Sequence, residues 1–409
     1  MSRGRRIWIR RAATAVVACA VTLAWAAAVA AAPGELERTA AAGDVMRGWR
    51  VFHQKQCVEC HAIWDEGGHI GPDLGRSRTG RLSSGTLAGV MWNHIPKMLS
   101  RMSATGHAPP TLTRDEMADL FALIFFARQL DEQGDPARGR EILRRKGCAE
   151  CHSVDTSDGG IGPDLAKWGG YANSVVWAQM MWEHAPLMEA AMTQSQITWP
   201  KLEGSDLVHI VAYVRSVGVS GEKIYLHPGS ETNGRRLFAE KGCHQCHPGT
   251  GPDLSTVELP RSIGALASRM WNHSPDMAKV MQARDVKREP IAPQELADIL
   301  AYVLALGNRD RAGDRARGER VFAQKGCSQC HDRREVAGAV GPIVAQLRRD
   351  AAPVDMATAL WNHGETMLER MTEAGITWPV FDNQEMVDLL AFLRSVEPPS
   401  ETPADRGAR

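Results

Sequence analysis

The chain has 409 residues, and its 48 basic side chains (Lys and Arg) equal its 48 acidic ones in number. The balance hides an asymmetry, because the first 32 residues hold five arginines and no acid, so that the remainder carries 43 basic against 48 acidic side chains. A mildly acidic body gives no support for nucleic acid as a partner and would suit a basic protein partner.

The N-terminal segment has the order of a secretory signal. Met1 to Arg11 is basic, Ala12 to Ala32 is apolar, and an Ala-Val-Ala triplet offers a cleavage site before Ala31. Residues 1–31 are therefore predicted to be a signal peptide, which places the protein in the periplasm or outside the cell. An uncleaved membrane anchor is the alternative, because about 20 apolar residues just span a bilayer.

A C-x-x-C-H motif recurs four times and uses eight of the nine cysteines. This spacing is typical of covalent c-type haem attachment, in which two thiols add to the haem vinyl groups and the adjacent histidine becomes the proximal iron ligand. Four motifs predict four covalently attached haem c groups. The predicted attachment cysteines are Cys57, Cys60, Cys148, Cys151, Cys243, Cys246, Cys327 and Cys330, and the predicted proximal ligands are His61, His152, His247 and His331.

Zinc binding and thiol redox chemistry are the alternatives for a C-x-x-C pair. A zinc site would need two closely spaced pairs, but the pairs here start 91, 95 and 84 residues apart. A thioredoxin-like pair would lie in a βαβ pattern, whereas the flanking segments here have helical patterns. Both alternatives are therefore disfavoured.

Each motif lies in a repeat of similar design. The repeat opens with Gly-Asp, except in the third, where only Gly234 is recognised, and an amphipathic segment then leads into the cysteines. After the histidine a loop ends in Gly-Pro, whose carbonyl suits a fixed acceptor for the proximal imidazole N–H. The Gly-Pro pairs are Gly71-Pro72, Gly162-Pro163, Gly251-Pro252 and Gly341-Pro342. Closing helices are predicted over Thr113–Arg128, Glu203–Ser216, Pro293–Leu306 and Asn383–Ser395.

Between the loop and the closing helix every repeat carries Trp-x-His-x3-Met-x3-Met. The tryptophans, expected to wall the haem pockets, are Trp92, Trp182, Trp271 and Trp361. The histidines are His94, His184, His273 and His363; the first methionines are Met98, Met188, Met277 and Met367; the second are Met102, Met192, Met281 and Met371. Pro96, Pro186 and Pro275 follow the histidines, and they predict that a middle helix ends there.

With these elements the sequence resembles class I c-type cytochrome domains, in four tandem copies. The resemblance implies an all-α fold of four small cytochrome c-like helical domains, each enclosing one covalent haem. The expected domains are residues 36–131, 134–220, 229–308 and 313–396, called units one to four below, with a disordered tail at 397–409. It also implies export, because haem of this type is attached outside the cytoplasmic membrane in bacteria.

The sequence departs from this family at the distal iron ligand. Class I domains usually carry Met-Pro a little before the last helix, but the chain has Ala108-Pro109, Trp199-Pro200, Glu289-Pro290 and Trp378-Pro379. A helix ending at the proline would leave the second methionine in a segment free to cross the haem face. We therefore favour Met102, Met192, Met281 and Met371 as distal ligands, ahead of the first methionines and the histidines.

Two weaker patterns complete the repeat comparison. Units two and four share Ile-Thr-Trp-Pro, which suggests that units pair in sequence order, one with two and three with four. Six other histidines do not recur in register and are expected to be surface or structural. They are His53, His69, His107, His209, His227 and His244.

The predicted function is single-electron transfer between a redox protein donor and a redox protein acceptor. Outside the haem motifs the sequence shows no nucleotide-binding loop and no nucleophile motif, so an electron carrier is favoured over an enzyme, and no small-molecule substrate is expected. The first alternative is a haem enzyme, a peroxidase or small-oxide reductase with one five-coordinate haem, for which unit one is the candidate. The second is a haem subunit of a larger respiratory complex.

Overall fold

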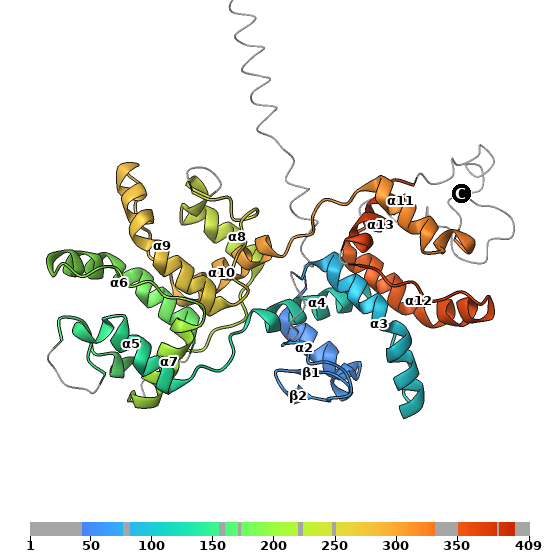
Figure 1. The fold of residues 1–409 in the computed structure, drawn as a ribbon, viewed down its shortest axis with the longest axis horizontal. Coiled ribbons are helices and arrows are strands. Elements are labelled where there is room, and N and C mark those ends of the chain that lie inside the picture. Colours follow the sequence, from blue (N-terminus) through green and yellow to red (C-terminus); the bar gives the residue numbers. More distant parts are fainter. Residues whose placement is uncertain are drawn as a thin grey trace, which may run out of the picture. The chain divides into compact units, whose positions relative to one another are not determined.

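The computed structural model describes residues 43–76, 82–154, 160–170, 173–219, 224–247, 251–331, 351–382 and 384–396 (Figure 1). The predicted signal peptide at 1–31 and the predicted tail at 397–409 lie outside these residues. Among the helices described, none combines the length and the apolar character that a bilayer crossing requires.

Each unit contains a first, a middle and a last helix. The first helices are α2 (Val45–Gln54), α5 (Pro136–Arg145), α8 (Glu231–Glu240) and α11 (Arg315–Gln324). The middle helices are α3 (Ser84–Thr105), α6 (Ser174–Gln194), α9 (Ile263–Ala283) and α12 (Pro353–Glu373). The last helices are α4 (Arg114–Gln129), α7 (Asp206–Val217), α10 (Pro293–Gly307) and α13 (Glu385–Arg394). The predicted all-α fold is confirmed.

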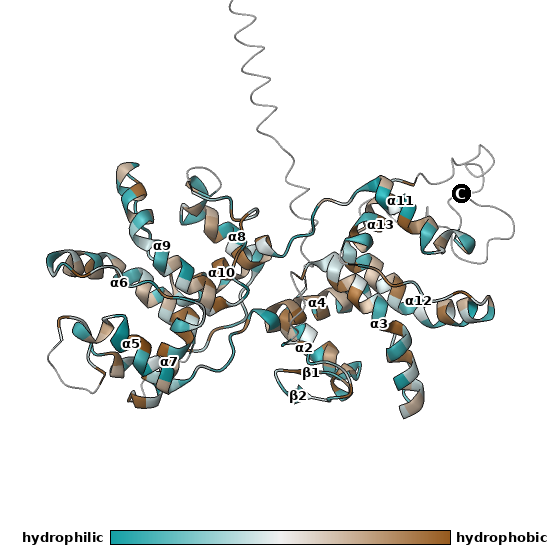
Figure 2. Cartoon of the chain, viewed as in Figure 1, coloured by the Kyte–Doolittle hydropathy of each residue, from teal (hydrophilic) through white to brown (hydrophobic). Residues whose placement is uncertain are grey.

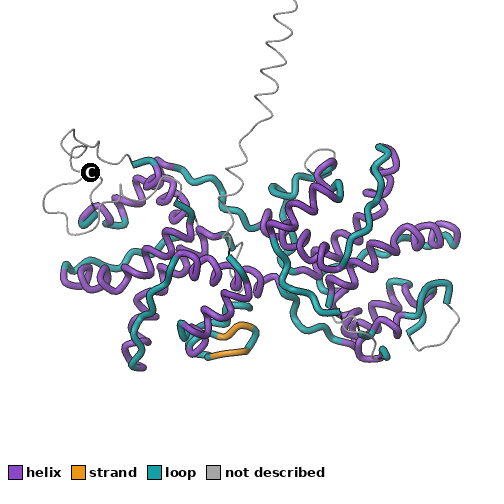
Figure 3. Tube along the Cα trace, turned by 180° about the vertical axis from the view of Figure 1, so that it is seen from behind, coloured by secondary structure: helices purple, strands orange, loops and turns teal. Residues whose placement is uncertain are grey.

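Shorter elements complete the units. Each first helix is followed by a 3-10 turn that begins at the first cysteine of the motif: η1 (Cys57–Glu59), η2 (Cys148–Glu150), η4 (Cys243–Gln245) and η5 (Cys327–Gln329). A further turn, η3, spans Leu165–Trp168. In unit one the strands β1 (Ala62–Ile63) and β2 (Glu66–Gly67) form a small antiparallel hairpin after the motif, drawn in orange in Figure 3.

The first and last helices of each unit cross at a glycine. A Cβ atom at Gly48, Gly139, Gly234 or Gly318 would lie 1.9–2.1 Å from a main-chain oxygen of the last helix, so only glycine permits this approach. The glycine that opens each repeat meets the same helix. In unit three that residue is Gly229, which the sequence comparison missed because Ser230 replaces the usual aspartate as helix N-cap.

Within the part of the chain that the structure describes, two hydrophobic cores serve the four units. One core joins units one and four, and the other joins units two and three. Middle helix α3 packs against α12, and α6 packs against α9, as Figure 1 shows. In Figure 2 apolar and polar residues alternate around the helices, as expected when each buries one face. The predicted pairing of units in sequence order is therefore wrong.

The middle helices continue through their prolines, so the predicted helix ends are also wrong. Pro96, Pro186 and Pro275 lie inside α3, α6 and α9. A proline has no N–H, and it leaves the oxygen four residues earlier without its helical donor. These three oxygens belong to Trp92, Trp182 and Trp271.

Each freed oxygen accepts a hydrogen bond from the paired unit. Trp378 Nε1 donates to Trp92 O over 3.2 Å, and Trp199 Nε1 donates to Trp271 O over 3.1 Å. Arg288 Nη2 donates to Trp182 O over 2.9 Å. The packing of the units thus satisfies the polar groups that the prolines expose, which explains why the helices do not end.

Unit four shows the converse arrangement. Its middle helix has Glu365 in place of proline, so Trp361 O keeps its helical donor. In the paired unit one, Pro109 occupies the position that Trp199, Arg288 and Trp378 occupy in the other units. A proline has no N–H to donate. A donor is therefore present where the paired helix has a proline and absent where it has none.

Candidate haem sites

In units one to three the motif histidine contacts the proline oxygen that the sequence predicts as its acceptor. Nδ1 of His61, His152 and His247 lies 3.0, 2.9 and 2.8 Å from the main-chain oxygens of Pro72, Pro163 and Pro252. A hydrogen bond to this oxygen places the proton on Nδ1 and leaves Nε2 as the nitrogen able to bind a metal. The fourth acceptor, Pro342, lies outside the described residues.

In units one to three the glycine before the proline has a role that sequence reasoning missed. A Cβ atom at Gly71 or Gly162 would lie 2.4 or 2.5 Å from Cε1 of the proximal histidine ring, and one at Gly251 would lie 2.8 Å away. Only a glycine lets the loop pass this close to the imidazole. The loop therefore fixes the ring both by contact and by the hydrogen bond.

The first cysteine of each motif follows a residue with positive φ. Gly147, Gly242 and Gly326 have φ of 77°, 78° and 80°, and Gln56 has 61° in unit one. Burial raises the pKa of the Cys57, Cys148, Cys243 and Cys327 thiols to about 11. A thiol with a raised pKa is protonated at neutral pH.

Cavities lined mainly by apolar side chains adjoin the motifs of units two, three and four. Each is lined by both cysteines, the proximal histidine, the histidine of the Trp-x-His phrase and both methionines. The cavities of units three, two and four have volumes of about 430, 230 and 100 Å³, and the first of these is within the range of cofactor sites. The residues present therefore fit a haem bound through the two cysteines and the proximal histidine.

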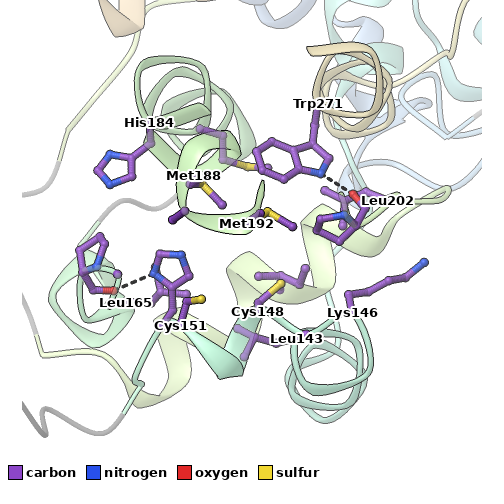
Figure 4. A pocket seen from close by; sticks show the side chains of 18 of the residues that line it. Leu143, Lys146, Cys148, Cys151, Leu165, His184, Met188, Met192, Leu202 and Trp271 are labelled. Atoms are coloured by element: carbon purple, nitrogen blue, oxygen red, sulfur yellow. Dashed lines mark hydrogen bonds between the residues drawn. The ribbon is translucent and has the colours of Figure 1, made fainter. Parts of the chain in front are cut away.

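The three candidate distal ligands share one helix in each unit. In Figure 4, Met188 and Met192 lie in the middle of the unit-two pocket, between His184 and the two cysteines. The segment expected to cross the haem face is helical instead, because α6 runs on past both methionines. Spacings of four residues along a helix bring all three side chains to the same pocket.

Three of the four tryptophans of the Trp-x-His phrase line the candidate cavities, and each lines the cavity of the paired unit. Trp271 of unit three lines the pocket of unit two, and Trp182 of unit two lines the pocket of unit three. Trp92 of unit one lines the pocket of unit four. The sequence could not show this exchange, because it depends on which units pack together.

Two of the other histidines have structural partners. His209 Nδ1 accepts a hydrogen bond from Asp135 N over 2.9 Å, a position filled by aspartate in the other units. His107 Nε2 lies 2.6 Å from a carboxylate oxygen of Glu59 in the unit-one motif. For both residues the prediction of a structural role is confirmed.

The repeats have a common register before the last helix. The amides of His107, Ile197, Val286 and Ile376 each donate to the oxygen of the second methionine of their own unit. By this register the counterparts of Trp199-Pro200 are Pro109-Pro110 and Arg288-Glu289. The pairs Ala108-Pro109 and Glu289-Pro290 chosen from the sequence are each one residue out.

Two cysteines, a fixed histidine and an apolar pocket between three helices are the arrangement expected of a protein with covalently attached haem. Two stretches of the chain match the family model described as Cytochrome c, residues 45–124 and 136–218. The matched stretches are therefore similar to cytochrome c domains, and they lie in units one and two. Searches among curated proteins and among solved structures found no significant match.

Proposed function

We propose that the protein is an exported tetrahaem cytochrome that transfers single electrons between a donor and an acceptor redox protein. The observation that carries the proposal is the repetition of one complete pocket. The family match covers units one and two, and the pockets of units three and four contain the same set of residues. Export is supported by the basic and apolar N-terminal segment.

The proposed roles of the site residues are supported by the residues that line the pockets of units two, three and four. The eight motif cysteines attach the four haems, and His61, His152, His247 and His331 are the proximal ligands. Met102, Met192, Met281 and Met371 are proposed as distal ligands, with the first methionines and the histidines as alternatives. Haem supplies the redox chemistry, while a thioether ligand and an apolar pocket both raise the reduction potential.

Near-infrared magnetic circular dichroism of the purified oxidised protein, combined with a pyridine haemochrome count, tests this function. Four haems with a methionine-to-iron charge-transfer band scaled to all four are the expected result. A histidine pair at each iron would abolish that band and move the distal assignment to His94, His184, His273 and His363. A high-spin haem that binds cyanide rapidly would overturn the electron-carrier proposal.

Unit one is the candidate site for the alternative function, an enzyme with one five-coordinate haem. His107 stands where the other units have Ile197, Val286 and Ile376, which line their pockets. Its Nε2 lies 2.6 Å from a carboxylate oxygen of Glu59, however, so the ring already has a partner in the motif of its own unit. Conversion of His107 to Ile should therefore leave the cyanide reactivity unchanged.

A further inference from the structure

The haem pockets of units two and three are completed by each other's middle helix. Trp271 from α9 forms part of the wall of the unit-two pocket, and Trp182 from α6 forms part of the wall of the unit-three pocket. The pocket of unit four receives Trp92 from α3 in the same way. A pocket of this kind is incomplete without the paired unit.

The indoles that cross the interface are fixed in place. Trp271 Nε1 donates to Pro200 O over 2.7 Å, a bond drawn dashed in Figure 4, and its ring stacks on Trp199 with a centroid distance of 4.0 Å. Trp92 and Trp378 repeat the stack at 4.1 Å. Trp92 and Trp271 are 3% and 6% exposed, so both rings are buried between two units.

The residue that follows the tryptophan in each Trp-x-His phrase also forms hydrogen bonds across the interface. Asn272 both donates to and accepts from the main chain of Leu202, with both distances 2.7 Å. Asn93 makes the same pair of bonds with Phe381, and Asn362 makes it with Leu112.

Unit two replaces this asparagine with a carboxylate. Glu183 can accept from Ile291 N but cannot donate, and Gln179, one helical turn earlier, donates to Ile291 O instead. Each pair of units therefore has reciprocal contacts of the kind seen in a two-fold dimer.

We propose that the haems are coupled as pairs, two with three and one with four, and that Trp271, Trp182 and Trp92 are positioning residues for the haem of the paired unit. The proposal rests on the electron-transfer function above. With haem attached in both pockets of a pair, an electron would pass between the two haems without any bond being made or broken. Because charge interaction falls with distance, paired haems should also perturb each other's reduction potential most.

A redox titration of the full-length holoprotein tests the pairing without any substitution. Haem methyl resonances in proton NMR spectra are assigned to units through contacts with the attached cysteines, and the pairwise interactions are then extracted from the titration. The largest interactions are expected between haems two and three and between haems one and four. Largest interactions between haems one and two and between haems three and four would overturn the proposal.

Trp271→Phe tests the positioning role. It should shift the resonances and the potential of the unit-two haem more than those of the unit-three haem, although Trp271 belongs to unit three. Trp361→Phe is the matched control in the other pair and should leave haems two and three unchanged. A Trp271→Phe effect confined to the unit-three haem would overturn the role.

Failure of the proposed function would look different. A carrier that is instead an enzyme would show a high-spin, cyanide-binding haem, whichever haems are coupled. The pairing can therefore fail in a protein that is an electron carrier, and it can hold in one that is not.

Discussion

The indole nitrogen of Trp378 donates to the main-chain oxygen of Trp92 over 3.2 Å, and this is the oxygen that Pro96 leaves without a helical donor. The two residues are 286 positions apart. Trp199 stands in the same relation to Trp271 and Pro275. The continuity of a middle helix and the pairing of two units therefore depend on one another.

Replacing Trp378 with Phe keeps an aromatic side chain but removes the N–H donor together with one ring of the indole that stacks on Trp92. The oxygen of Trp92 is then left without a partner, and the free energy of unfolding should fall by about 1–2 kcal/mol. In a Pro96→Ala background the alanine amide supplies the missing bond, so the cost of Trp378→Phe should shrink. Denaturant unfolding of the four holoproteins in this cycle measures the coupling, and strictly additive effects would argue against the proposed link.

Unit four provides the opposite experiment, because its helix has no proline and its paired unit has no donor. Glu365→Pro should cost about 3 kcal/mol or more, as expected for proline inside a helix. Glu365→Ala is the control and should be close to neutral. Adding Pro109→Trp to Glu365→Pro should recover part of the loss. Equal unfolding free energies for the two Glu365 variants would contradict this account.

The contacts that could be predicted from the sequence are the local ones. The bond from His247 to Pro252 spans five residues, so a motif and a loop length were enough to propose it. The bond from Trp92 to Pro379 spans 287 residues, and its acceptor is a main-chain oxygen that every residue possesses. Nothing in a sequence pattern distinguishes such an acceptor.

The errors in the middle helices have the same physical origin. A proline was expected to end each helix because its local cost is large, and that cost is offset by donors from another unit. Units two and four share Ile-Thr-Trp-Pro because each supplies an indole donor to the unit with which it pairs. Trp199 and Trp378 each face a proline-bearing helix of a different unit, so their shared sequence does not indicate mutual contact.

Gln56 occupies a backbone conformation that glycine adopts in the other units. Its φ is 61°, whereas Gly147 at the same position has 77°. A left-handed conformation costs a non-glycine residue roughly 1–2 kcal/mol, although glycine loses more entropy on folding. Gln56→Gly should therefore stabilise unit one by about 0.5–1 kcal/mol.

The reverse substitution is the matched control for Gln56. Gly147→Gln should destabilise unit two by a similar amount, because a Cβ atom there meets nothing closer than 3.4 Å and only the backbone is strained. Calorimetric melting of the holoproteins compares the two. A gain from both substitutions, or a loss from both, would show that conformation is not what distinguishes the two positions.

The contribution of Asp388 to the free energy of unfolding should depend on pH. Burial opposes its ionisation, but hydrogen bonds from Arg317, from the Asp314 amide and from Gln384 together lower its pKa. A carboxyl whose pKa is lower in the folded state adds stability above its unfolded pKa, and that stability is lost as the pH falls through the folded pKa. Asp388→Asn should therefore lower the melting temperature by a few degrees at pH 7, and the difference should close below about pH 4.

Melting curves of the two proteins between pH 7 and pH 3 test the assignment. The wild-type protein should lose stability more steeply than the variant over the acid range only. A difference that stays constant across the whole range would mean that the aspartate acts through its shape and its neutral hydrogen bonds, and not through its charge.

The loop glycine beside the proximal histidine offers the most direct test of the haem site. A Cβ atom at Gly162 would lie 2.5 Å from Cε1 of His152, so Gly162→Ala must move the ring or the loop and disturb the bond to Pro163 O. Crowding of this kind costs about 1–3 kcal/mol, and a shifted imidazole changes the ligand field of one haem. Gly89→Ala is the control, because its Cβ would meet Met386 at an ordinary 3.4 Å.

The two variants should differ in one haem only. Pyridine haemochrome and electron paramagnetic resonance are expected to show an altered or missing haem in Gly162→Ala and four unchanged haems in Gly89→Ala. Identical spectra would mean that the proximal ring tolerates the displacement.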